Sequence, residues 1–399
     1  MKIVTINLTP YGSTGKIMRQ ISKLAVEYKN SVYIFTKNWY DSKIKMTNHT
    51  YIGSLFENAV SRILNPFFGL DGKFSYFSTK RMLKKIKKIK PDIVHLHNIH
   101  GWYLDYQMLF DFLQKNNYNV IWTLHDCWSF TGHCPNFDSI DCKKWKTGCF
   151  DCKQLGNYPA MKIDNTNKMW NNKKKWFASL SKLTIVTPSR WLKDLVKQSY
   201  LKKFETVVIN NGIDLNIFKP VKSNFKEKNN IANKKILLGV SFGWGYLKGL
   251  DVIVTLSHLI NNEIYQIVLV GTDDNIDKIL PSNIISVHRT NNQKELAEIY
   301  SSAYVLINPT REDNYPTVNM ESIACGTPVI TFNTGGSPEI LTEKTGIVTK
   351  DKTAQSILVE LDNVEKINRE DCVKAAKMFD MNEKFNEYIK LYEKVMEKN

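Results

Sequence analysis

The chain lacks a long apolar segment. None of its 399 residues belongs to a run of eighteen or more consecutive apolar residues, so no membrane-spanning helix is expected. The sequence begins directly with a strand-like stretch at residues 2–7, without the apolar core of a secretory signal peptide. These two absences predict a cytoplasmic protein.

Several familiar phosphate-binding motifs are also missing. No Asp-x-Asp pair of the kind that holds a divalent metal occurs, so we expect any phosphate to be met by protein groups, with no metal cofactor required for catalysis. The segment Gly12-Ser-Thr-Gly15-Lys16 follows the first strand, but it is neither a Gly-x-Gly-x-x-Gly fingerprint nor a full P-loop. Its position at a helix start suits a bound anion, and a structural turn explains it equally well.

Acidic residues are few relative to basic ones. The 55 Lys and Arg outnumber the 39 Asp and Glu, which gives a net charge of +16 and favours an anionic partner. The densest basic stretch is 80–90, where apolar residues occupy one helical face and lysines the other. We interpret it as a surface helix whose lysine face docks on the anionic inner-membrane surface, which predicts peripheral association with the cytoplasmic face of the membrane.

Apolar residues upstream of this basic helix could add an edge that dips into lipid headgroups. They are Phe56, Leu64, Phe67, Phe68 and Leu70. Nucleic acid is not expected as a partner, because no nucleic-acid-binding motif accompanies the charge.

Length and composition suit two globular domains, since 399 residues are too many for one core and 43% are apolar. Strand-like and helix-like segments alternate almost throughout, which predicts an α/β fold with doubly wound parallel sheets. Strands are expected at 2–7, 32–35, 93–97, 120–124 and 183–187, and again at 235–240, 266–270, 284–288, 305–308 and 329–332. Helices are expected at 15–27, 79–89, 106–115, 167–180, 190–197, 249–259, 294–301, 316–325 and 382–396. Turn residues between 207 and 220 mark a boundary, which divides the chain into 1–207, 208–380 and a final helix in 381–399.

The stretch 311–336 carries the most chemical information. Pro316 suits the first turn of a helix that ends at a glycine. Glu321 shares a stripe of this helix with Val318 and Cys325, so its carboxylate should face inward among apolar neighbours. A short helix with an inward carboxylate is typical of a receptor for a phosphorylated sugar or nucleotide. An ordinary amphipathic helix with a solvated Glu fits the pattern equally well.

Polar residues end two expected parallel strands of the first domain. His97 and Asn98 follow one strand, and His125 and Asp126 follow the next. Open α/β sheets bind ligands at the carboxyl ends of their strands, so these four residues are candidates for function. In the second domain, Lys248 stands at the entry of a helix, where it suits a diphosphate leaving group.

Four of the seven cysteines fall within one loop, expected at 127–158. They are Cys134, Cys142, Cys149 and Cys152. In a reducing cytosol such a cluster indicates metal rather than disulfides, and a structural zinc ion would hold a loop that is too long to hold itself. Ordinary thiols are the alternative.

With these motifs the chain resembles the retaining glycosyltransferases of family 4, which have the GT-B fold. Two acidic residues separated by seven, Asp313 and Glu321, match the family's donor-site motif, and the linker at 211–220 matches its "NG-[VI]-D…F-x-P" pattern. Further segments look like the subgroup that acts in bacterial capsule, exopolysaccharide, colanic-acid-type and O-antigen assembly: PDIVHLHNIHGWY, TLHDCWSFTGHC, KWKTGC, TIVTPSRWL and DNYPTVNMESIACGTPVI. The resemblance implies two Rossmann-like domains facing a central cleft, with the C-terminal helix crossing back to the N-terminal domain.

The resemblance also implies a function: transfer of a sugar from a nucleotide-diphosphate sugar to a glycan acceptor linked to a lipid diphosphate. In the usual mechanism the acceptor attacks the face from which the nucleotide leaves, and the β-phosphate takes the acceptor proton. Glu321 would hold the nucleotide ribose and Asp313 the donor sugar, with Glu312 as an alternative because Asp is shorter than the family's Glu. The family's Arg is replaced by Phe242, so Arg311 or Arg289 would have to supply its charge.

Three sets of site residues follow. The catalytic set is His125, Lys248, Asp313 and Glu321. The donor set is Gly12, Gly15, Lys248, Arg311, Asp313, Tyr315, Pro316, Thr317, Val318 and Glu321. The acceptor set is Gly15, His97, Asn98, His125 and Asp126. Two other functions stay open at this point: a different GT-B enzyme such as a sugar-nucleotide epimerase, and a zinc-containing nucleic-acid-binding protein.

Overall fold

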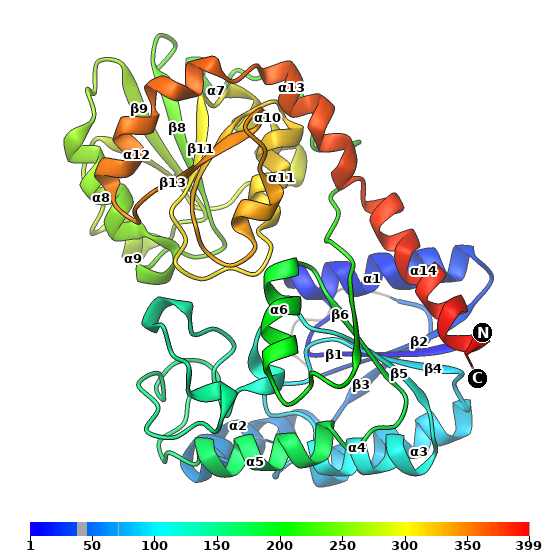
Figure 1. Cartoon of the computed structure of the whole chain (residues 1–399). Coiled ribbons are helices and arrows are strands. Elements are labelled where there is room, and N and C mark those ends of the chain that lie inside the picture. Colours follow the sequence, from blue (N-terminus) through cyan, green and yellow to red (C-terminus); the bar gives the residue numbers. More distant parts are fainter. Residues whose placement is uncertain (38–45, 71, 399) are drawn as a thin grey trace. The chain divides into compact units, whose positions relative to one another are not determined.

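The computed structural model describes residues 1–37, 46–70 and 72–398. The chain divides into two compact units (Figure 1). The N-terminal unit contains Met1–Asn210 together with Phe385–Asn399, and the C-terminal unit contains Asn211–Lys384. Each unit has its own parallel sheet, as the alternation of strands and helices predicts.

The N-terminal unit is built on a parallel sheet with the strand order β3-β2-β1-β4-β5-β6-β7. Its strands are β1 Lys2–Asn7, β2 Ser31–Lys37, β3 His49–Ile52, β4 Ile93–Leu96, β5 Asn119–Thr123, β6 Leu183–Thr187 and β7 Glu205–Val208. Its helices are α1 Gly12–Glu27, α2 Leu55–Phe68, α3 Tyr76–Ile89, α4 Tyr106–Lys115, α5 Thr166–Phe177 and α6 Arg190–Gln198, with 3-10 turns η1 Trp128–Phe130, η2 Asp138–Ile140 and η3 Lys144–Lys146. The central strands are buried throughout because helices cover both faces of the sheet.

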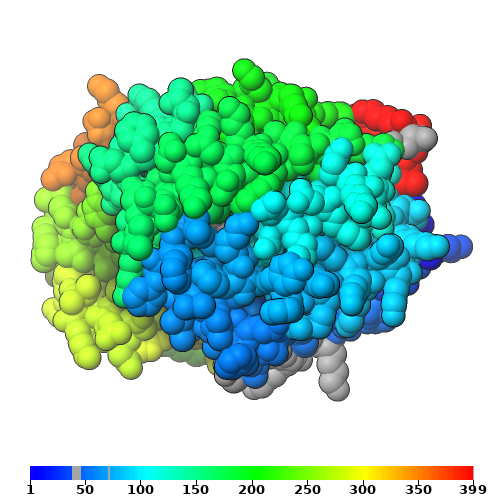
Figure 2. All heavy atoms as spheres, turned by 90° about the horizontal axis from the view of Figure 1, so that it is seen from below, coloured from blue at the N-terminus to red at the C-terminus, as the bar shows by residue number. Residues whose placement is uncertain are grey.

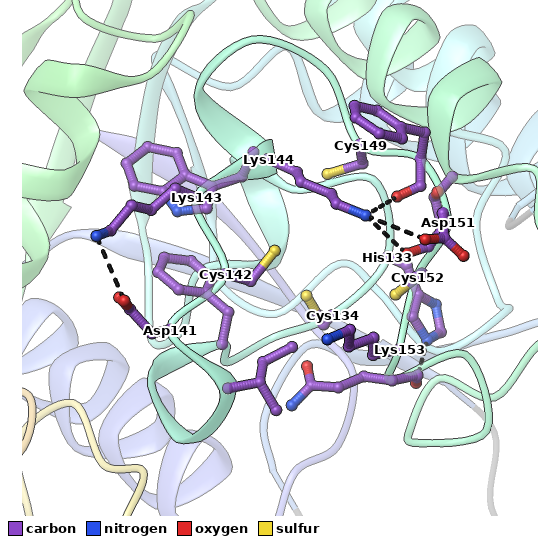
Figure 3. A pocket seen from close by; sticks show the side chains of 16 residues that line it. His133, Cys134, Asp141, Cys142, Lys143, Lys144, Cys149, Asp151, Cys152 and Lys153 are labelled. Carbon is purple, nitrogen blue, oxygen red and sulfur yellow. Dashed lines mark hydrogen bonds and ion pairs between the residues drawn. The ribbon is translucent and has the colours of Figure 1, made fainter.

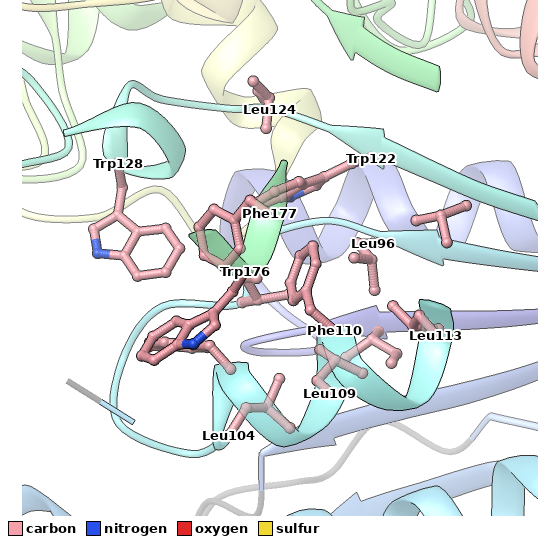
Figure 4. Packing of buried hydrophobic residues seen from close by; sticks show 14 of the residues in the cluster. Leu96, Leu104, Leu109, Phe110, Leu113, Trp122, Leu124, Trp128, Trp176 and Phe177 are labelled. Carbon is pink, nitrogen blue, oxygen red and sulfur yellow. The ribbon is translucent and has the colours of Figure 1, made fainter. Parts of the chain in front are cut away.

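Large aromatic side chains fill the core between this sheet and helices α4 and α5 (Figure 4). Phe177 contacts the rings of Phe110 and Trp122 at centroid distances of 4.4 and 5.0 Å. Phe177 also packs against Trp128, the first residue of η1 in the loop after β5. The core therefore extends directly beneath the segment that carries His125 and Asp126.

The C-terminal unit has a parallel sheet with the order β10-β9-β8-β11-β12-β13. Its strands are β8 Lys235–Val240, β9 Tyr265–Val270, β10 Ile284–Val287, β11 Val305–Asn308, β12 Val329–Phe332 and β13 Gly346–Thr349. Its helices are α7 Phe225–Lys228, α8 Leu250–Leu259, α9 Asp274–Asp277, α10 Gln293–Ser302, α11 Thr317–Ala324, α12 Ala354–Glu360 and α13 Arg369–Ala375, with 3-10 turns η4 Tyr246–Lys248, η5 Ser337–Ile340, η6 Asp362–Lys366 and η7 Ala376–Phe379. Separate apolar clusters pack on the two faces of the sheet.

The last helix, α14 Met381–Glu397, starts in the C-terminal unit and ends in the N-terminal unit (Figure 1). Its Tyr392 hydroxyl lies 2.8 Å from Nδ1 of His95, which is fully buried in β4. Thr123 of β5 donates a hydrogen bond of 3.3 Å to the Tyr388 hydroxyl and lies 2.8 Å from the other nitrogen of His95. The predicted return of the C-terminal helix to the first domain is confirmed.

The doubly wound α/β fold predicted from the sequence is also confirmed, with some elements missed. The sequence prediction omits α2, in which exposed apolar side chains and Pro66 obscure the helical period. It omits the short strands β3, β7 and β13 as well. One detail is wrong: Pro316 is the N-cap residue of α11, with extended backbone at φ −69° and ψ 116°, and lies just before the first turn. Within the described residues, no helix combines the length and apolar character needed to cross a bilayer.

The hydrogen bond between Tyr392 and His95 should help to hold α14 in place. Changing Tyr392→Phe removes the hydroxyl and leaves a buried imidazole nitrogen without its partner, so the free energy of unfolding should fall by about 1–3 kcal/mol. Urea unfolding followed by circular dichroism measures the change. Glu393→Gln, an exposed change on the next residue of the same helix, is the control. Equal stability of Tyr392→Phe and the control would contradict the assignment.

Candidate functional site

Most of the candidate donor residues gather at the carboxyl ends of β8, β11 and β12, whereas Gly12 and Gly15 of the predicted donor set lie in α1 of the N-terminal unit. The chain winds from β8 outward to β9 and β10 on one side, and from β11 to β12 and β13 on the other. The strand order therefore reverses between β8 and β11. In open parallel sheets this switch point is where ligands bind, because neighbouring loops diverge there.

Glycines allow the loops at this switch point to touch. A side chain on Gly335, which has φ +53°, would clash with the carbonyl oxygen of Asp313 at 1.7 Å. Gly249, at φ +75°, meets the carbonyl oxygen of Pro309 in the same way at 2.4 Å. Arg311 also donates its backbone N–H to the carbonyl of Leu247 at 2.8 Å. The loops after the three strands are thereby fixed against one another.

Two predicted catalytic residues form an ion pair at this point. Nζ of Lys248 lies 2.8 Å from Oδ2 of Asp313, with side chains 38% and 23% exposed. Both groups remain accessible, so a phosphate or a sugar hydroxyl can compete for either partner. It is Asp313 whose carboxylate meets Lys248, whereas the neighbouring Glu312 is buried and its carbonyl accepts a hydrogen bond from Thr310.

Arg311 is bound to another carboxylate. Its guanidinium makes two hydrogen bonds of 2.7 Å to Asp251, and it lies over the Tyr246 ring at 4.0 Å from the centroid. The hydrogen bonds from Arg311 lower the pKa of Asp251 and raise that of the arginine. Phe242, which stands where the family has Arg, is 97% exposed, and Arg289 is also exposed. Arg311 thus holds the segment around the start of α8 through Tyr246 and Asp251, and the Asp251 carboxylate balances its charge.

Glu321 points inward from α11, as the helical pattern predicts. The residue is 9% exposed, and one carboxylate oxygen accepts a hydrogen bond of 3.1 Å from the Tyr300 hydroxyl of α10. Burial, with the nearby Glu321 carboxylate as a second cause, raises the pKa of Tyr300 well above its usual value. Burial also raises the pKa of Cys325, one turn later, to about 12. The environment therefore combines apolar burial with a fixed donor, the Tyr300 hydroxyl.

The start of α11 offers backbone groups for an anion. Its N-cap residue Pro316 provides no side-chain acceptor, and no acidic residue lies in the first turn. Tyr315 is buried, while Thr317 and Val318 are partly exposed. Three buried polar atoms close by in the sequence have no hydrogen-bond partner among the described residues: Nδ2 of Asn319, Oγ1 of Thr334 and Oγ of Ser337. Such atoms are rare in folded proteins and indicate positions for a ligand or water.

The candidate acceptor residues lie at the corresponding switch point of the N-terminal unit, between β1 and β4. Asn7 ends β1 and accepts a hydrogen bond of 3.1 Å from the backbone N–H of Asn98 after β4. Gly12 and Gly15 start α1. A side chain on Gly15 would lie 2.5 Å from the carbonyl carbon of Pro10. The close approach of the Pro10 backbone at the start of α1 therefore requires glycine at position 15.

His97 and His125 meet at the ends of β4 and β5. Nδ1 of His97 lies 3.1 Å from Nε2 of His125, with the rings stacked at 17°. Burial lowers the pKa of His97 well below its usual value and that of His125 to about 4. Both rings are therefore neutral near pH 7, and one nitrogen of the pair donates to the other. Nε2 of His97 is buried without a partner in the described structure.

Asp126 forms a second pair that the sequence analysis missed. One carboxylate oxygen lies 3.0 Å from Nε2 of His100, and the other accepts the backbone N–H of Trp128 at 2.9 Å. Nδ1 of His100 lies 3.1 Å from the hydroxyl of Tyr158. These contacts outweigh burial and lower the pKa of Asp126. The third His of the segment HLHNIH was the available signal for His100, whereas nothing local points to Tyr158.

These groups line a small, open hollow of about 10 Å³. It is lined by His97, Asn98, His100, His125 and Asp126, with apolar walls from residues of β5 and η1. All four predicted acceptor residues after β4 and β5 are thus brought together, in an arrangement of neutral imidazoles beside one carboxylate. Such a set can orient a hydroxyl group through several hydrogen bonds.

Comparison with known proteins adds independent information. The model of the glycosyltransferase family 4 domain matches residues 19–217, and that of glycosyl transferases group 1 matches residues 221–379. A protein of Escherichia coli (strain K12), provisionally described as colanic acid biosynthesis glycosyl transferase WcaC, is 26% identical over 283 residues, 69% of this chain and 68% of the relative.

Solved structures share the fold over the whole chain. Sucrose-phosphate synthase from Thermosynechococcus elongatus superposes with a TM-score of 0.73 at 18% identity, covering 100% of both chains. Anabaena Alr3699/HepE, solved in complex with UDP and glucose, superposes with a TM-score of 0.67 at 12% identity, covering 99% of this chain and 100% of the other. At these identities the likeness establishes the fold, which is GT-B.

The low pKa of His125 predicts a pH dependence of stability. In the unfolded chain His125 binds a proton near pH 6.5, whereas in the folded chain it does so only near pH 4. The free energy of unfolding should therefore fall as the pH decreases through this window. His125→Asn removes that proton and should reduce the slope by up to about 1.4 kcal/mol per pH unit. Denaturant unfolding at several pH values tests this, with the exposed His258→Asn as control. A slope unchanged by His125→Asn would contradict the neutral assignment.

Proposed function

Because this chain belongs to glycosyltransferase family 4, we propose that it is a retaining enzyme that transfers a sugar from a nucleotide-diphosphate sugar to a lipid-diphosphate-linked glycan during bacterial surface polysaccharide biosynthesis. One observation carries the proposal. The accessible pair Lys248–Asp313 lies at the switch point of the C-terminal sheet, next to the helix that buries Glu321.

The donor chemistry follows from the charges at this switch point. Lys248 would leave Asp313 for the diphosphate, which carries more charge than one carboxylate, and the freed Asp313 would accept hydrogen bonds from sugar hydroxyls. The diphosphate would also meet the N–H groups at the start of α11. Glu321 would accept hydrogen bonds from the ribose, held in place by the Tyr300 hydroxyl. The complex of the structural neighbour HepE with UDP and glucose supports a nucleotide-sugar donor.

The acceptor would bind to the N-terminal unit through the hollow at β4 and β5. Neutral His97 and His125 cannot draw a proton strongly from the acceptor hydroxyl, but they can orient it. In the mechanism we propose, the hydroxyl attacks the anomeric carbon from the face that the nucleotide leaves. Its proton passes to the departing β-phosphate oxygen, whose negative charge Lys248 stabilises. The enzyme then contributes alignment and electrostatic stabilisation and forms no covalent intermediate.

The exposed surface of α2 and α3 suits an enzyme whose acceptor is carried by a membrane lipid. The ion pair of Arg81 with Glu57 links the two helices, and the stretch that contains them (blue to light blue) lies on the face seen in Figure 2. Met82, Leu83 and Ile86 of α3 are buried as predicted, and the lysines of the basic stretch are exposed. Phe56 and Phe77 are 76% and 67% exposed. We propose that this face docks on the anionic cytoplasmic surface of the membrane.

The predicted apolar edge is only partly exposed. Phe67 and Phe68 are about half exposed, at 47% and 49%. Leu64 is partly buried, and Leu70 packs against the core. The docking face therefore consists of aromatic residues of α2 and the start of α3 beside the lysines of α3.

Glu321→Gln tests the donor assignment. The amide keeps the size and the inward position but loses the charge and two acceptor sites, so sugar transfer should fall by about 100- to 1,000-fold while the melting temperature stays close to the wild-type value. Transfer is measured with radiolabelled nucleotide sugars and membrane extract as acceptor, and nucleotide binding by calorimetry. The exposed Glu343→Gln is the matched control. Near-normal transfer by Glu321→Gln would refute the donor site.

The membrane proposal is tested by reversing the charge of α3. Changing Lys84, Lys85, Lys87 and Lys88 to Glu should weaken binding to vesicles with anionic lipid by more than about tenfold, because each lysine near the surface contributes about 1 kcal/mol. Vesicle sedimentation measures the binding, with uncharged vesicles as reference. The control reverses four exposed lysines of the C-terminal unit, namely Lys278, Lys344, Lys352 and Lys377. Equal binding by the two variants would reject the docking face.

A further inference from the structure

Four cysteines of the loop after β5 line one hollow. The hollow has a volume of about 210 Å³, and Cys134, Cys142, Cys149 and Cys152 face into it from different parts of the loop (Figure 3). None of them is joined in a disulfide. We propose that these four thiolates bind one structural Zn²⁺ ion, which holds the loop in its folded form.

The loop has little regular structure of its own. Every residue between β5 and α5 is described, and together they form only the short 3-10 turns η1, η2 and η3. One side of the loop is anchored by aromatic packing, with Trp145 stacked on Phe137 at 5.2 Å and bound through its carbonyl to Trp170. The other side is the hollow, where the thiols meet. A metal cross-link is one way in which a long loop without regular structure is kept ordered.

A buried positive charge stands beside the cysteines. Lys173 of α5 is 0% exposed, and its ammonium donates to the carbonyls of Trp128 and Thr131 at 2.9 and 3.2 Å. A Zn²⁺ ion with four thiolates carries a net charge of −2, which a neighbouring buried cation stabilises.

Further groups around the hollow fit a thiolate site. The backbone N–H of Gly132 donates to Sγ of Cys149 at 3.1 Å, and a side chain at Gly132 would meet Cβ of Cys149 at 2.7 Å. N–H donors to sulfur are the usual outer contacts of thiolate ligands. His133 also lines the hollow and is 1% exposed, with its Nδ1 lacking a partner in the described structure.

Binding requires the sulfur atoms to move closer together. The four cysteine sulfurs do not all lie within 4.8 Å of one another. Among the described residues, the group of possible ligands that does is the exposed set Asp274, Asp277 and His288. A tetrahedral site with Zn–S bonds of about 2.3 Å places sulfurs roughly 3.8 Å apart. The open hollow leaves room for this contraction, in which the four thiols release their protons to solvent. Metal binding should therefore make the loop more compact.

The full-length protein, purified without chelator, tests the proposal by elemental analysis. About one zinc per chain is expected, and Co²⁺ substitution should give thiolate-to-metal charge-transfer absorption with the visible bands of a tetrahedral site. Cys142→Ser and Cys152→Ser should weaken metal affinity by about 100-fold or more. The control Cys372→Ser, a buried thiol of the C-terminal unit, should keep one zinc.

The outcomes are distinct. Absence of zinc after purification together with no cobalt absorption on reconstitution would overturn the proposal, as would full metal retention by both ligand variants. Loss of metal in His133→Gln would overturn the four-cysteine ligand set. Because the cobalt spectrum is measured on the unchanged protein, the test holds even if the serine variants do not fold. None of these results depends on the identity of the donor or acceptor.

Discussion

The contact between Gly335 and the carbonyl of Asp313 sets the geometry on which the C-terminal site depends. A residue with any side chain would force these two loops apart. With glycine at this position, the loop after β12 packs against the backbone of Asp313 in the loop after β11. The Asp313 carboxylate then contacts Lys248, which belongs to the loop after β8. The loops after the neighbouring strands β8, β11 and β12 therefore hold this accessible ion pair in position, and no side chain has to span a long distance. This is how a parallel sheet produces a fixed site from flexible loop residues.

The two units differ in how they treat charge. In the C-terminal unit, Arg311 is neutralised by Asp251, whereas Lys248 and Asp313 are paired but partly exposed. This leaves one pair that a charged substrate can reorganise. In the N-terminal unit, burial keeps His97 and His125 neutral, and Asp126 is held by hydrogen bonds. The charged donor and the uncharged acceptor hydroxyl of the proposed reaction would suit these two environments, since each would meet groups of matching polarity.

Sequence reasoning found the parts of the site that are local and missed those that depend on distant segments. Glu321 is buried as expected, although all residues from Asn319 to Ala324 are buried, so the helical period alone does not account for its burial. Residues at strand ends could be grouped because parallel strands share an edge. The long-range pairs could not be predicted. Arg311 pairs with Asp251, which is 60 residues away in sequence, and His100 contacts Tyr158, which is 58 residues away. Pairings of this kind depend on loop paths that carry no periodic signal. The same holds for α2, whose exposed phenylalanines suit a surface more than a helix packed on a sheet.

The cysteine loop bears on the acceptor hollow through a short chain of contacts. Asp126 is fixed by the backbone N–H of Trp128, and the Trp128 carbonyl accepts a hydrogen bond from the buried Lys173. Lys173 also binds the Thr131 carbonyl, three residues before Cys134. A metal ion that fixed this segment would therefore fix Trp128, and with it the orientation of Asp126 toward His100. The physical role of the loop would then be to hold a buried carboxylate and imidazole in position at the end of β5. In the proposed mechanism, the acceptor hydroxyl would need rigid hydrogen-bonding groups there more than a strong base.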